Sequence, residues 1–217
     1  MRGKQTSAMS ERKAEIIASD ILSYTQKLSQ TVDRLRRNGC SESELSFSYD
    51  SDGDNNYQDS GDTYYNANAL TDLSCHVFHP LGGNIKFIKI PEIPVSELNS
   101  GDSLYNITGS LRTSLGDATQ NELAIMIISN ASNTTWTSPE YPNMRLLCEK
   151  INNLLGNSFS TNGRNILTAG NHSTLTLPQF DGTYSGGQAI VSSNNTACYS
   201  DISGSNRFIF YHVLIVR

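Results

Sequence analysis

The clearest pattern of hydrophobic and polar positions lies at the start of the chain. Between residues 10 and 38, apolar residues recur at steps of three and four, as on one face of an α-helix. Ser7 or Ser10 can cap its start, and Asn38-Gly39 can end it. Because the apolar stripe is narrow, we expect the helix to lie on one sheet and keep its other side free. The stripe residues are Ala14, Ile17, Ile21, Tyr24, Leu28, Val32 and Leu35.

The remainder of the chain carries mainly the patterns of β-strands. Alternation and apolar runs predict strands over 45–49, 75–80, 84–90, 102–115, 122–130, 174–180, 188–192 and 207–217. The run over 122–130 is continuously apolar, which is typical of a central strand covered on both faces. A helical stripe of leucines and isoleucines predicts a second, short helix over 143–155, with Gly156 as its cap.

The cysteines add covalent links to this picture. The 217-residue chain contains Cys40, Cys75, Cys148 and Cys198, and none forms a CxxC pair. An even number of widely spaced cysteines suggests two disulfides and an oxidising compartment. Spacing alone leaves all three pairings open.

Together these elements predict an α+β fold. We expect a long N-terminal helix packed on an antiparallel β-sheet, with a short second helix inserted and two disulfides. The predicted organisation is an amphipathic stalk helix over 1–39 and a disulfide-stapled, β-rich head over 40–217.

Composition and charge exclude some classes of partner. The net charge is -5, and the basic residues form no dense patch outside the first helix, so we expect no nucleic acid. No apolar run has the length of a membrane span, and no signal-peptide core is present. Since the other features look exported, we expect that a targeting or membrane segment was removed ahead of residue 1, and that any membrane contact runs through that segment.

An acidic stretch is the candidate metal site. Its carboxylates are Asp50, Asp52, Asp54, Asp59 and Asp62. Alternating carboxylates on a loop can converge on Ca²⁺, and the first five residues match the start of an EF-hand loop. The match fails at its sixth position, Asn55, and at its twelfth, Gly61. A looser calcium loop and a solvated polar loop both remain open, and the second is favoured.

The other candidate chemistry is weak. His76 and His79 are three residues apart in a predicted strand, so they face opposite sides and do not chelate together. His172 and His212 are isolated. There is no GxSxG elbow and no phosphate-binding loop, so the sequence gives no positive sign of an enzyme.

Several segments resemble a known superfamily. A long N-terminal helix that feeds an antiparallel sheet, with "LLCEKINNLLG" placing a cysteine in a short helix, resembles the type IV pilins and type II secretion pseudopilins. "RLRRNGCSESELSF" and "CHVFHPLGG" resemble segments of single-span pilin-like proteins of Gram-negative bacteria. The resemblance implies the disulfides Cys148–Cys198 and Cys40–Cys75. It also implies that residues 7–38 correspond to the half of the family's helix that lies on the head, and it makes a calcium loop plausible. The family's leader and cleavage motif is not in this sequence.

Three functional hypotheses follow. The first is an exported pilin-like structural or adhesive subunit whose partners are other such subunits or surface ligands. The second is a secreted carbohydrate- or protein-binding module without catalytic activity. The third is a hydrolase whose histidine meets a serine or aspartate in a pocket. We expect an extracytoplasmic location, in the periplasm, at the cell surface or outside the cell.

Overall fold

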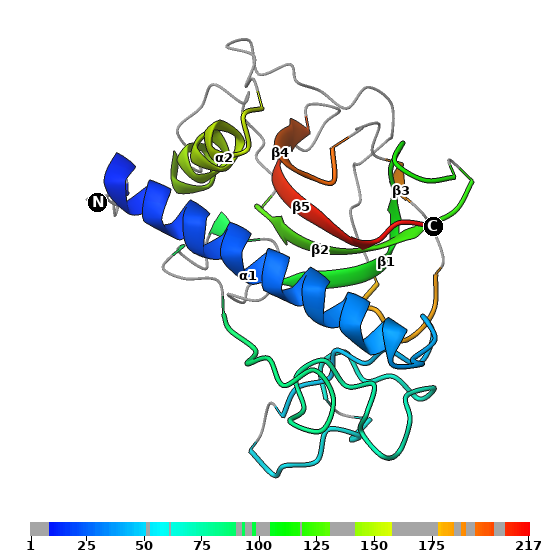
Figure 1. Cartoon of the computed structure of the whole chain (residues 1–217). Helices are drawn as coiled ribbons and strands as arrows, with labels where there is room; N and C mark the ends of the chain where they lie inside the picture. The colour runs from blue at the N-terminus through cyan, green and yellow to red at the C-terminus, as the bar shows by residue number, and fades with distance from the viewer. Residues whose placement is uncertain are drawn as a thin grey trace.

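A computed structural model describes the chain over residues 9–50, 53–60, 62–89, 93, 97–98, 105–117, 119–130, 142–157, 178–184, 188–189, 194–201 and 207–217. The long helix α1 runs across one face of a twisted sheet, and the shorter helix α2 lies beside its N-terminal half (Figure 1). The elements in chain order are α1 (Glu11–Arg37), β1 (Asn106–Arg112), β2 (Glu122–Ile128), α2 (Pro142–Leu154), β3 (Gln188–Ala189), β4 (Thr196–Asp201) and β5 (Arg207–Ile215). The predicted α+β class is confirmed.

Helix α1 begins and ends where the sequence supplies caps. The Ser10 side chain accepts a hydrogen bond from the Lys13 backbone N–H, which satisfies one free donor of the first turn. After Arg37 the chain turns at Gly39, whose φ of +106° favours glycine. All seven residues of the predicted stripe are buried, so the stripe lies against the rest of the protein along the whole helix.

The sheet has five strands in the order β3-β1-β2-β5-β4. The four longer strands pair antiparallel, and the two-residue strand β3 adds to β1 in parallel. Strand β2 lies between β1 and β5 and is buried at every position, as its apolar run predicted.

Alternate side chains of the strands enter two separate apolar clusters. On the helix face, Ile125, Ile127 and Phe210 share one cluster with the stripe of α1 and with Leu147 of α2. The opposite face carries a smaller cluster, formed by Leu111, Ala124, Met126, Ile128, Tyr199, Ile209, Tyr211 and Val213. Both helices therefore lie on the same side of the sheet and stabilise it by apolar burial.

Three predicted strands are wrong. Residues 45–49, 75–80 and 84–89 form turns and irregular chain, and their one ladder contact is an isolated bridge between Ser46 and His76. Apolar and polar residues alternate in these segments because only some of their side chains are buried. Leu45, Phe47 and Val77 are buried in the core although they lie in loops. The predicted strand over 188–192 is β3 at its first two residues, and residues 190–192 lie outside the described part. Of the strand predicted over 174–180, only 178–180 are described, and they form no strand.

Strand β4 was not predicted. Its sequence, TACYSD, is short and largely polar, so it lacks the apolar run of a core strand. Within the described residues, no helix is both long enough and apolar enough to cross a bilayer.

Candidate functional site

The first disulfide joins the end of α1 to the irregular region that follows. Cys40 and Cys75 are bonded with an S–S distance of 2.00 Å and a Cα–Cα distance of 5.7 Å. Cys40 is fixed in place because its N–H donates to the Leu35 carbonyl at 3.1 Å, directly after the helix turns at Gly39. This pairing is confirmed.

The second disulfide, Cys148–Cys198, joins α2 to β4 and is also confirmed. Two hydrogen bonds reinforce it, since Asn152 Oδ1 accepts from the Cys198 N–H at 3.1 Å and Asn152 Nδ2 donates to the Cys198 carbonyl at 2.6 Å. Strand β4 is an edge of the sheet, so this amide occupies backbone groups that would otherwise stay open. Asn152 was not predicted from the sequence, although its spacing of four from Cys148 places both residues on one helix face.

Disulfides persist mainly in oxidising compartments. All four cysteines are paired in this structure, and none is free. The chain therefore belongs to an oxidising, extracytoplasmic environment.

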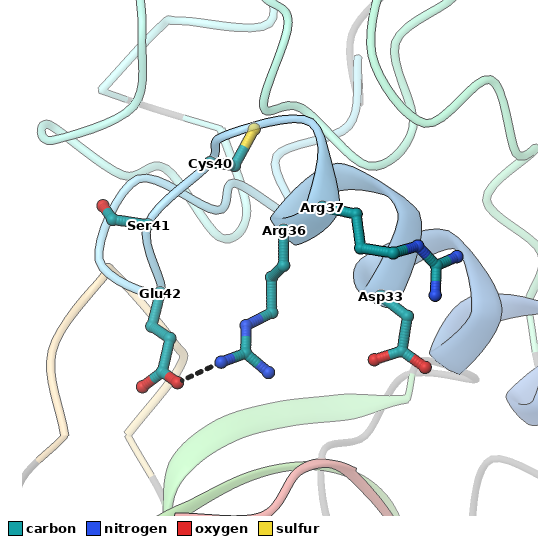
Figure 2. A pocket seen from close by; sticks show the side chains of 6 residues that line it. All are labelled: Asp33, Arg36, Arg37, Cys40, Ser41 and Glu42. Atoms are coloured by element: carbon teal, nitrogen blue, oxygen red, sulfur yellow. Dashed lines mark hydrogen bonds and ion pairs between the residues drawn. The ribbon is translucent and has the colours of Figure 1, made fainter.

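A polar pocket of about 410 Å³ lies at the C-terminal end of α1, next to the first disulfide. Figure 2 shows the Arg36 side chain extending to Glu42, while the Arg37 side chain points away from that pair. We call this cavity the α1-end pocket. Its described lining residues are Asp33, Arg36, Arg37, Cys40, Ser41 and Glu42.

The electrostatics of the α1-end pocket centre on Glu42. Its carboxylate pairs with Arg36 at 2.8 Å and with Arg217, beyond the end of β5, at 3.1 Å. The Arg217 guanidinium also lies 4.1 Å from the centroid of the Tyr184 ring. Burial raises the pKa of Tyr184, the Glu42 carboxylate raises it further, and the two arginines oppose both effects. Glu42 thus connects the end of α1 to the end of β5.

The α1-end pocket offers charge rather than a nucleophile. The described residues of its lining include no histidine, and its cysteine is held in a disulfide. The Ser41 hydroxyl lies 3.3 Å from the Ser43 hydroxyl, and neither group is a general base at neutral pH. The pocket can therefore bind polar or charged groups and can hold the two chain segments together.

The predicted calcium residues are only partly brought together. The Asp50 carboxylate accepts hydrogen bonds from the Gly53 N–H at 2.6 Å and the Asn55 N–H at 3.2 Å, and Asp54 accepts one from the Asn56 N–H at 2.7 Å. Such bonds between an aspartate and the next backbone amides stabilise tight turns. These two carboxylates therefore shape the loop.

Asp59 and Asp62, the other described aspartates of the acidic loop, lie in a turn. The Asp62 N–H donates to the Asp59 carbonyl at 3.0 Å, and Asp52 lies outside the described residues. In the part of the chain that the structure describes, no three histidine, cysteine, aspartate or glutamate side chains converge on one point. Among the described residues, the predicted calcium loop therefore has no assembled set of three ligands.

The three described histidines differ in their surroundings. His76 is buried, and neither of its ring nitrogens has a hydrogen-bond partner among the described residues. Burial lowers its pKa to about 4, so His76 is neutral at pH 7. His79 Nδ1 accepts from the Leu81 N–H at 3.1 Å, and His212 Nδ1 lies 2.5 Å from the Thr196 hydroxyl. His172 lies outside the described residues.

A buried polar network at the start of α2 was also missed from the sequence. The Glu97 carboxylate accepts from Asn143 Nδ2 at 2.6 Å and from the Met144 N–H at 3.1 Å, which satisfies a free donor of the first helical turn. Asn143 Oδ1 accepts from the Met9 N–H at 2.6 Å and so connects α2 to the start of α1. Burial raises the pKa of Glu97, and the hydrogen bonds from Met144 and Asn143 oppose it. These partners are too distant in sequence for any local motif to show them.

In comparisons with known proteins, no family model, no curated protein and no solved structure matches the chain.

Proposed function

We propose that the chain is an exported, pilin-like structural or adhesive subunit. It would be assembled in a surface filament or secretion pseudopilus of a Gram-negative bacterium, or displayed at the cell surface. The observation that carries the proposal is the placement of α1, a 27-residue helix whose apolar stripe lies along a β-sheet and whose end is fastened by a disulfide.

The placement of α1 suits a subunit that must hold a fixed orientation. The buried stripe extends from Ala14 to Leu35, so the helix cannot swing away without exposing large apolar side chains to water. Burial of each such side chain contributes roughly 1.5–3 kcal/mol before conformational entropy is counted. A helix docked in this way transmits force between its own end and the head.

The two disulfides support the same proposal. The first closes a segment with a sequence separation of 35 residues and the second one of 50 residues. Each link restricts the unfolded chain and is worth about 2–4 kcal/mol. Covalent links at both ends of the head suit a protein that is exposed to shear and to proteases.

Fractionation of cells tests the proposal. The protein is produced from its full gene in its own host, surface structures are removed by shearing, and the chain is followed by antibody in the sheared, periplasmic, cytoplasmic and medium fractions. We expect it in the sheared fraction, in particles that sediment. Recovery from the medium as a non-sedimenting species would favour the secreted binding module, and recovery from the cytoplasm would overturn both.

A further inference from the structure

A second cavity, of about 490 Å³, lies between the flank of α1 and the segment over residues 85–89. Lys27 on the helix and Lys86 and Lys89 on the segment line it, together with the half-buried side chains of Ile85 and Ile88. Among the described residues of this lining, Asp20 is the one acidic residue. We call this cavity the lysine groove.

Residues 85–89, which form one wall of the lysine groove, are fixed by aromatic and apolar contacts with the rest of the protein. Phe87 stacks on Tyr49 with ring centroids 3.9 Å apart and planes 2° apart, and it also meets Phe78 edge-on at 5.3 Å. Ile85 and Ile88 pack against the main core. With these three side chains held inward, Lys86 and Lys89 are left exposed at the groove.

The three lysines share the groove with one described carboxylate, that of Asp20. None of them takes part in an ion pair inside the described part of the chain. Lys27 is exposed as well, so all three ammonium groups can meet a partner from solvent. Three positive charges beside one aspartate make a local positive surface on a chain whose net charge is -5.

The complementary surface is present on the same chain. Residues 50–84 contain six aspartates and neither lysine nor arginine. Asp54, Asp59 and Asp72 are exposed in this region. Each copy of the protein therefore carries one positive groove and one negative loop region, so the charges of these two surfaces are complementary between two copies.

We infer that the lysine groove is the docking site for the acidic loop region, residues 50–84, of a second copy of this chain. Opposite charges steer such an encounter and fix its register. Because groove and loop are different surfaces, the contact either closes as a reciprocal pair or continues from copy to copy. The inference rests on the proposed function, since it names the contact through which subunits would assemble.

Charge reversal on each side of the contact tests the inference. The groove variant is Lys27→Glu, Lys86→Glu and Lys89→Glu, and the loop variant is Asp59→Lys and Asp72→Lys. A control with the same change in net charge as the groove variant is Arg12→Glu, Lys13→Glu and Arg145→Glu, at exposed positions outside the groove.

The readout is self-association of the full chain at low ionic strength, measured by sedimentation velocity. Zero-length carboxyl–amine cross-linking of a mixture of isotope-labelled and unlabelled wild type, with mass spectrometry, then shows which peptides are linked between chains. We expect the wild type to associate and to give intermolecular links between the groove and the acidic loop region, and high salt to suppress both. Each reversed variant alone should associate about tenfold or more weakly. A mixture of the two variants should regain the association, and the control should behave as the wild type.

Three results would overturn the inference: no intermolecular links in the wild type, equal loss in the control, or no recovery on mixing. Circular dichroism of every variant verifies that it is folded before sedimentation. A protein that fails this test and still fractionates with sheared surface structures would lose the docking contact and keep the proposed function. A protein found in the cytoplasm would lose the proposed function regardless of its cross-links.

Discussion

Truncation of Leu28 is the sharpest test of how α1 is docked. Leu28 lies in the middle of the helix, is 0% exposed and belongs to the main core cluster. Replacement by alanine removes three carbons, at about 0.8 kcal/mol each for transfer to water, and leaves a cavity that adds to this cost. We therefore expect Leu28→Ala to lower the free energy of unfolding by about 3–5 kcal/mol. In a chain of this size that corresponds to a fall in Tm of roughly 10 °C.

The matched control is on the same helix. Ile16 is 55% exposed, so Ile16→Ala removes a side chain of similar size that lies largely in solvent, whereas that of Leu28 is buried. We expect this variant to stay within about 0.5 kcal/mol of the wild type. The assay is urea unfolding followed by circular dichroism under non-reducing conditions, so that both disulfides stay intact. Equal effects of the two substitutions would refute the docking of α1 on the sheet.

Three further predictions concern the disulfides, a buried histidine and the edge of the sheet. Replacing either cysteine pair by alanine should cost about 2–4 kcal/mol, and the two costs should be similar, because loop closure depends only on the logarithm of loop length. Acidification should destabilise the protein through His76, whose pKa falls from 6.5 when unfolded to about 4 when folded, so the unfolded chain binds the extra proton between these values. The loss should grow as the pH falls from 6.5 to 4, and His76→Leu should remove it from plots of unfolding free energy against pH. Asn152→Ala should cost about 2–4 kcal/mol in urea unfolding because it leaves two buried backbone groups of β4 without partners, while the exposed neighbour variant Asn153→Ala should be near neutral.

Each of these predictions has an outcome that contradicts it. A cost below about 1 kcal/mol for either cysteine pair would show that the links do not restrict the unfolded chain. An unchanged pH dependence in His76→Leu would place the acid sensitivity elsewhere, for example at His212, whose pKa burial also lowers to about 4. Glu97 and Glu122 act in the opposite direction, since burial raises the pKa of both. Equal stability of Asn152→Ala and Asn153→Ala would contradict the role of Asn152 at the sheet edge.

Periodicity in the sequence was sufficient for the elements that pack face to face. The stripe of α1, the apolar run of β2 and the dense terminal run of β5 all form as predicted, because burial against one surface imposes a regular spacing on the chain. The second helix was predicted to begin at Asn143 and begins at Pro142. These elements define the sheet and the helices that cover it.

Periodicity gave wrong predictions in two cases: for buried segments that pair with no strand, and for a strand whose sequence is not apolar. Residues 84–89 alternate like a strand and pack apolar side chains inward, but they pair with no strand among the described residues. Strand β4 pairs fully with β5 although its sequence is mostly polar, because the second disulfide and Asn152 fix it from the other side. The contacts of Glu42 and Glu97 join distant segments, so no local pattern could have predicted them.

One measurement tests both the cellular location and the fold of the protein. It is the disulfide map of the protein taken directly from its source cells. Free thiols are blocked with an alkylating agent during lysis, and the peptides are then analysed by mass spectrometry without reduction. The account predicts that Cys40 is linked to Cys75, that Cys148 is linked to Cys198, and that no cysteine is alkylated. Alkylation of all four cysteines would contradict the extracytoplasmic assignment, and a crossed pairing would contradict the fold.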